Sequence, residues 1–246
     1  MPPKQRPNRV ELPGAKRRPD RRLLLGLLGA AAVVAVIAIV LSVATGGHKT
    51  AVPTTIVGSG TLLDGIPEHG LVLGNPQAKV TLTEYIDTSC PICRDYVLAT
   101  FPAIVKQYVR PGKVKVEARV LAFVGPSSAR GRELVLAAAR QDNAWKLTEL
   151  DYHNQGDEQT AWLTDVVARA FAAKVPGLNI DTLFTDAKSA GVQAEAAAMD
   201  AEAQTDGVTG TPTFVLTTPD GKRHGLGVGA YPFSAFVTAL DRALKG

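Results

Sequence analysis

The fold is decided by residues 80–93, which read VTLTEYIDTSCPIC. Apolar residues at positions 80, 82 and 86 alternate with threonine or tyrosine at positions 81, 83 and 85, and this period is typical of a strand with one buried face. The apolar residues that follow, between positions 96 and 105, favour a helix that Pro102 should kink. The stretch therefore predicts a strand that passes directly into a helix, with Cys90 at the junction.

Cys90 and Cys93 are the only cysteines in the chain. A structural disulfide across two intervening residues closes almost no loop and would stabilise little. A zinc site needs about four ligands, and the four histidines show no ligand spacing. We therefore expect no metal ion and no cofactor, with a zinc site shared between two chains as the alternative. The pair is best interpreted as a CxxC that cycles between dithiol and disulfide.

The spacing of the two cysteines predicts a different role for each. The exposed N–H groups and the dipole at a helix N-terminus stabilise an anion and so lower the pKa of a thiol. Pro91 suits the first helical turn, where no N–H partner is lost. Cys93 lies three residues on, on the same helix face and within bridging reach. We expect Cys90 to be the attacking thiolate and Cys93 the buried resolving thiol.

Glu84 has the same parity as the apolar residues of the predicted strand. The pattern points its carboxyl inward, where burial would raise its pKa. A carboxylate with a raised pKa suits a proton acceptor for the buried thiol, so Glu84 is a third candidate catalytic residue. The alternative is an acid at the end of the strand with access to water.

Two motifs in this order resemble the DsbA-like thioredoxin domains. Residues 74–93 resemble the opening of those domains, and residues 207–215, which read GVTGTPTFV, resemble their cis-proline loop and the strand after it. The resemblance implies an α/β thioredoxin fold with an α-helical insertion, over about residues 66–246. It also implies that Pro212 is the cis-proline, that Thr211 presents its backbone to the substrate, and that Glu84 is the buried acid of the family.

The chain departs from the best-known oxidases of that family between its cysteines. Those oxidases carry a histidine there, which helps to stabilise the thiolate, whereas this chain has Pro91 and Ile92. Only the backbone N–H groups of the helix are left to stabilise the Cys90 thiolate.

The rest of the domain fits this outline. The alternation in residues 113–124 predicts a second strand, and residues 213–217 and 223–228 predict a hairpin. An apolar stripe on a final helix comprises Phe233, Phe236, Val237, Leu240 and Leu244.

The region between the second strand and the hairpin is rich in helix-forming residues. It predicts three or four helices, with breaks at residues 154–156 and 176–177. The resemblance implies that this insertion, at about residues 126–206, caps the active site. Trp145, Tyr152 and Trp162 are candidates for lining a peptide groove, with core packing as the alternative for each.

The N-terminal region predicts a membrane anchor. Residues 23–44 carry no charge, and a helix of that length would span roughly 33 Å, about the hydrocarbon thickness of a bilayer. Residues 1–22 hold eight basic and two acidic side chains, so the positive-inside rule predicts a basic cytoplasmic tail and an exported domain. Residues 45–65, rich in Thr, Gly, Ser and Pro, are interpreted as a linker. The alternative is a cleaved signal peptide ending near residue 44.

The charge distribution argues against a nucleic-acid partner. The chain has a net charge of +4, but the basic tail accounts for all of it, and the remaining residues carry 19 basic and 21 acidic side chains. A nucleic-acid surface would place its basic residues on the folded domain.

Together these features predict a thiol–disulfide oxidoreductase at the cell membrane, anchored by a single N-terminal span. Its catalytic domain would lie outside the cytoplasm, where it donates disulfides to reduced or misoxidised exported proteins. A membrane redox partner, quinone-linked, would reoxidise it. The alternatives are an extracytoplasmic disulfide reductase and a non-catalytic thioredoxin-like binding module.

Overall fold

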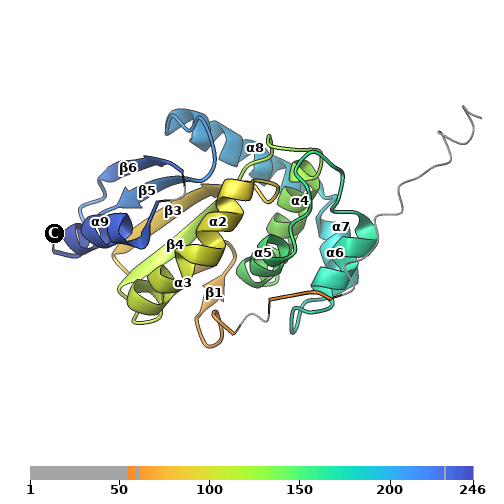
Figure 1. Cartoon of the computed structure of the whole chain (residues 1–246), viewed down its shortest axis with the longest axis horizontal. Helices are drawn as coiled ribbons and strands as arrows, with labels where there is room; N and C mark the ends of the chain where they lie inside the picture. The colour runs from red at the N-terminus through yellow and green to blue at the C-terminus, as the bar shows by residue number, and fades with distance from the viewer. Residues whose placement is uncertain (1–54, 59–60, 230, 246) are drawn as a thin grey trace, which may run out of the picture. The chain divides into compact units, whose positions relative to one another are not determined.

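A computed structural model describes residues 55–58, 61–229 and 231–245, and these form a six-stranded mixed sheet with helices on both faces (Figure 1). The sheet order is β1-β2-β4-β3-β5-β6, in which β3 and β4 are parallel and every other pair is antiparallel. The strands are β1 (Glu68–His69), β2 (Val72–Leu73), β3 (Val80–Ile86), β4 (Val114–Val120), β5 (Thr213–Thr217) and β6 (Arg223–Val228).

The helices fall into two groups. Those that belong to the sheet core are α2 (Pro91–Ala99), α3 (Phe101–Ile104), the π-helical turn η1 (Val105–Val109) and α9 (Phe233–Lys245). Those of the insertion between β4 and β5 are α4 (Ser128–Ala139), α5 (Ala144–His153), α6 (Asp165–Ala172), α7 (Ile180–Asp186) and α8 (Ala190–Thr205). Figure 1 shows α2, α3 and α9 in front of the sheet and α8 behind it.

Strand β3 lies in the middle of the sheet and is covered on both faces. Val80, Leu82 and Ile86 join the main core with residues of α2 and α9. Tyr85 points the other way and packs with Ala203 of α8. Because both faces are buried, the strand–helix junction at Cys90 is held by the best-packed part of the domain.

The helix after the cysteines is broken earlier than the predicted kink. It ends at Ala99, and Pro102 is near the start of the next helix rather than in the middle of one. Pro102 has no N–H and so cannot donate to the carbonyl of Leu98, as a continuous helix would require. Thr100 at the break is fixed instead by its hydroxyl, which donates to the carbonyl of Tyr231 at 3.0 Å.

Strand β4 is shorter than the predicted strand, which ran to residue 124. It ends at Val120, although the N–H of Leu121 still donates to the carbonyl of Ile86 in β3 at 2.8 Å. The N–H groups of Phe123 and Val124 donate to the carboxylate of Asp87 at 2.9 and 3.1 Å. The end of β4 is therefore tied to the loop that carries the cysteines.

The insertion holds five helices within the described residues, one more than the upper predicted number. Three of them begin at a side-chain cap, where Thr164, Asn179 or Ser189 accepts the N–H three residues on. These caps separate the insertion into more helices than its glycines and prolines alone would predict. The insertion also has an apolar core of its own, built by α4, α5, α6 and α7.

The three aromatic residues proposed for a peptide groove are buried. Trp145, Tyr152 and Trp162 expose 4%, 0% and 6% of their surface. The groove interpretation is wrong for all three, and the core-packing alternative is confirmed.

The predicted apolar stripe of the last helix is confirmed at Phe236 and Leu240, with Phe233 packed against the same core, and is wrong at Leu244. Phe236, Leu240 and Ala243 form the buried face of α9, while Leu244 is 37% exposed. Positions i, i+4 and i+7 therefore face the sheet, and Leu244, which comes next after Ala243, lies on the outer face of the helix.

The folded domain begins earlier than residue 66. Leu63 is 2% exposed and belongs to the main core, so residues 63–65 are not part of a linker. The predicted tail and anchor, residues 1–22 and 23–44, lie outside the described residues. Within the described ranges, no helix has the length and apolar composition needed to cross a membrane.

Candidate active site

Cys90 is the N-cap of α2, as the strand–helix junction predicts. Its Sγ accepts the N–H of Cys93 at 3.3 Å, and Pro91 fills the first helical position. Cys90 is 4% exposed and Cys93 is 0% exposed, and neither forms a disulfide in this structure. Of the two sulfurs, Cys90 is therefore the one that another molecule can reach.

The two thiols have opposite acidities. The pKa of Cys90 is lowered to about 6, and the largest cause is a hydrogen bond from the Cys93 thiol. Burial opposes this shift, while the hydroxyl of Thr211 and the N–H groups of Ile92 and Cys93 add to it. Burial, followed by the neighbouring Cys90, raises the pKa of Cys93 well above its usual value. At neutral pH the site therefore holds one thiolate and one thiol.

The loop before β5 brings Thr211 and Pro212 against the cysteines, although they lie more than a hundred residues away. The Thr211–Pro212 peptide bond is cis, and the Cys90 thiol donates to the carbonyl of Thr211 at 3.3 Å. The Thr211 hydroxyl is buried beside the two sulfurs.

Glu84 lies inside the sheet core, as its parity predicts, and is 1% exposed. Its carboxyl accepts a hydrogen bond from the hydroxyl of Tyr96. Burial raises the pKa of Glu84 to about 8, with the Tyr96 hydrogen bond opposing that rise. The alternative of an acid in contact with water is wrong, and at neutral pH this carboxyl carries a proton that it can give up.

Tyr96 is a residue that the sequence analysis missed. It lies three positions after Cys93 on α2, so the two side chains share a helix face. Burial and the charge of Glu84 raise the pKa of Tyr96 well above its usual value, and the charge of Cys93 contributes to the same effect. Tyr96 is therefore the hydrogen-bond partner of the buried acid and shares a helix face with the resolving cysteine. Helical spacing counted forward from the predicted buried thiol could have found it.

Asp87 shapes the turn that precedes Cys90. Its carboxylate accepts the N–H of Ser89 at 2.9 Å in addition to those of Phe123 and Val124, and its carbonyl accepts the N–H of Cys90. This fully buried side chain ties the redox turn, residues 87–90, to the end of β4.

Helix α4 of the insertion packs directly on the redox turn. A Cβ at Gly131 would lie 1.9 Å from the hydroxyl oxygen of Thr88, a separation that no two such atoms can adopt. Only glycine permits this approach, so the first turns of α4 and the redox turn fit each other closely.

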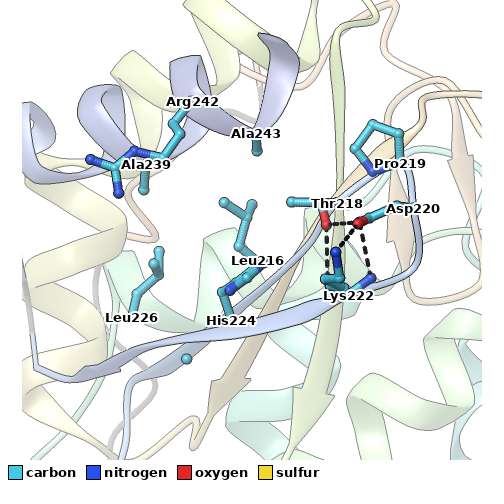
Figure 2. A pocket seen from close by; sticks show the side chains of 11 residues that line it. Leu216, Thr218, Pro219, Asp220, Lys222, His224, Leu226, Ala239, Arg242 and Ala243 are labelled. Carbon is cyan, nitrogen blue, oxygen red and sulfur yellow. Dashed lines mark hydrogen bonds and ion pairs between the residues drawn. The ribbon is translucent and has the colours of Figure 1, made fainter. Parts of the chain in front are cut away.

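A cavity of about 720 Å³ lies far from this chemistry, between the β5–β6 hairpin and α9 (Figure 2). Its walls include Leu216 and Ala243, and at its edge Asp220 is bonded to Lys222 and Thr218. Strand β5 begins directly after Pro212 and ends directly before Thr218, so these two residues lie at opposite ends of the strand. The cavity therefore belongs to the other end of the strand and forms no part of the cysteine site.

Comparison with known proteins agrees with this geometry. A family model described as Thioredoxin matches residues 67–224. The probable disulfide bond formation protein D of Bacillus cereus is 26% identical over 180 residues, which cover 70% of this chain and 78% of that protein.

Solved structures have the same fold. BdbD from Bacillus subtilis, in its oxidised form, matches with a TM-score of 0.63 and 21% identity over 74% of this chain and 99% of its own. A thioredoxin-like oxidoreductase from Silicibacter pomeroyi matches with a TM-score of 0.58 and 26% identity over 77% of this chain and 99% of its own. The chain belongs to the thioredoxin family, and it is a DsbA-like thiol–disulfide oxidoreductase.

Proposed function

We propose that this oxidoreductase donates disulfides to exported proteins through Cys90 and Cys93. The observation that carries the proposal is the lowered pKa of Cys90 beside the raised pKa of Cys93. A stable Cys90 thiolate stabilises the reduced protein relative to the disulfide form. A disulfide whose reduced form is stabilised passes readily to other thiols.

The reaction begins from a Cys90–Cys93 disulfide and a substrate with two thiols. A substrate thiolate attacks Cys90 Sγ, which forms a mixed disulfide and releases Cys93 as a thiolate. Glu84, protonated at neutral pH, supplies the proton that Cys93 takes up. The second substrate thiolate then attacks the substrate sulfur of the mixed disulfide, which forms the substrate disulfide and releases the Cys90 thiolate. Two electrons pass from the substrate to the enzyme.

Thr211 and Pro212 are proposed to hold the substrate beside Cys90. The Thr211 carbonyl lies 3.3 Å from Cys90 Sγ, so a chain bound along this loop would place its own sulfur next to Cys90. Two apolar side chains near this loop are exposed: Ile92, between the cysteines, and Val228, opposite Thr213 across the hairpin. Such a surface suits an unfolded chain that still exposes apolar residues.

Reoxidation requires an electron acceptor, and we propose a quinone-linked membrane protein. The motivation is the uncharged stretch at residues 23–44 after a basic tail, which would tether the catalytic domain outside the cytoplasm. Alkaline carbonate washing of membranes from cells that express the full chain tests the anchor. Release of the intact protein into the wash would contradict it.

The redox potential of the Cys90–Cys93 pair tests the direction of electron flow. Thioredoxin has a potential of about −270 mV and DsbA one of about −120 mV. We expect a value between these two potentials for residues 55–246 equilibrated in glutathione buffers, because a Cys90 pKa of about 6 lies between those typical of the two proteins. A value near that of thioredoxin would support the alternative of an extracytoplasmic reductase.

A further inference from the structure

The end of α5 and the residues just after it donate hydrogen bonds to the redox turn. The amide nitrogen of Gln155 donates to the carbonyl of Thr88 at 2.7 Å and to that of Cys90 at 3.1 Å. The hydroxyl of Tyr152 donates to the carbonyl of Asp87 at 3.1 Å. Three of the four carbonyls in the turn therefore receive a donor from one short piece of the insertion.

Gln155 is itself fixed by its neighbours on both sides. The side chain of Asn154 exchanges two hydrogen bonds with the backbone of Val57 and donates a third to the carbonyl of Leu150. A Cβ at Gly156 would lie 2.5 Å from the indole ring of Trp162, so this glycine is packed flat against that ring. The backbone of Gln155 cannot shift without breaking one of these contacts, and its amide therefore reaches the turn from a set position.

The Gln155 amide acts on Cys90 in two ways. It is a second donor to the carbonyl of Cys90, which also accepts the N–H of Arg94, and so it helps to hold the N-cap geometry in which Sγ accepts the N–H of Cys93. Its N–H dipoles also point their positive ends at the turn that carries the thiolate, in a site with little water to screen them. Neither effect depends on which way electrons flow.

We propose that Gln155 is a positioning residue of the redox reaction, whose amide keeps the turn in the shape and field that favour the Cys90 thiolate. The inference goes beyond disulfide donation, because a reductase with this site would depend on the same thiolate. The helical insertion therefore contributes to the chemistry at Cys90 as well as to the shape of the domain.

Three variants of the described domain test the proposal. Gln155→Glu replaces the donor with a charged acceptor, and Gln155→Met removes the donors at nearly the same length. Gln159→Glu is the matched control, since Gln159 is an exposed residue of the same loop whose side chain bonds only to Glu158. The pKa of Cys90 is measured from thiolate absorbance at 240 nm, and the equilibrium constant with glutathione from the oxidised fraction.

We expect Gln155→Glu to raise the pKa of Cys90 by about one unit, which corresponds to an equilibrium constant about fivefold less oxidising at pH 7. Gln155→Met should shift both quantities in the same direction by a smaller amount, and Gln159→Glu should shift neither. Gly156→Ala, which forces the segment away from Trp162, should reproduce the effect of Gln155→Met.

The proposal is overturned if Gln155→Met leaves the Cys90 pKa and the glutathione equilibrium at their original values, whatever happens to the melting temperature. A lower melting temperature alone would mark Gln155 as a structural contact. Since Gln155→Met adds no charge, it carries the test even if Gln155→Glu does not fold. The potential of the unsubstituted protein decides the direction of electron flow separately, so the two proposals fail independently.

Discussion

Cys90→Ser is expected to reduce thiol–disulfide exchange to the uncatalysed rate. Cys90 is the one sulfur of the pair that another molecule can reach, and the hydroxyl of serine neither ionises near neutral pH nor forms a disulfide. The measurement is the oxidation of a reduced test protein, together with the reduction of insulin by dithiothreitol. Exchange at the original rate in this variant would mean that the reaction does not pass through Cys90.

The same assays separate catalysis from binding. A thioredoxin-like binding module would show no turnover before the substitution, so Cys90→Ser would change nothing. The pH dependence of the unsubstituted protein adds a second criterion. Alkylation of Cys90 by iodoacetamide should speed up as the pH rises, because only the thiolate reacts, and should be half-maximal near the Cys90 pKa of about 6. This fast phase should be missing in Cys90→Ser.

Substituting Cys93 should stop turnover at a different step. In Cys93→Ala, Cys90 can still form a mixed disulfide with oxidised glutathione, but no second thiol lies in the site to resolve it. We therefore expect the mixed disulfide to accumulate and to be visible as an added mass of one glutathione. Turnover equal to that of the original protein would contradict the role of Cys93.

The two substitutions at Cys93 also differ in their effect on Cys90. The Cys93 thiol is the largest cause of the lowered pKa of Cys90. Cys93→Ala removes this donor, so the pKa of Cys90 should rise, whereas the hydroxyl in Cys93→Ser should keep part of the effect. An equal pKa in the two variants would mean that the helix N-terminus, rather than the neighbouring side chain, sets the acidity of Cys90.

The parts of the site that the sequence predicts are local. The position of Cys90 at a helix N-terminus and the inward direction of Glu84 follow from strand and helix periods over a few residues. The approach of Thr211 to Cys90 is not local, and it was predicted only through the resemblance to the DsbA-like domains. No periodic pattern links residues that lie 121 positions apart.

The contacts that shape the turn left no signal in the sequence. The carboxylate of Asp87 accepts the N–H groups of Phe123 and Val124 just after β4, and Gln155 reaches two carbonyls of the turn from the residues after α5. In each case one partner is a backbone group, whose position depends on the finished fold. A glutamine in a polar loop has the same appearance in the sequence whether it binds water or a catalytic turn.

The close fit of the insertion to the redox turn limits how far this domain can be shortened. A truncated version that joins β4 directly to β5 would keep both cysteines, Glu84 and the Thr211–Pro212 loop. It would also strip the side-chain donors from the carbonyls of Asp87, Thr88 and Cys90 and remove the helix that packs on Thr88 through Gly131. Engineering a smaller catalyst from this scaffold therefore requires new donors for those carbonyls, built before the helices are cut away.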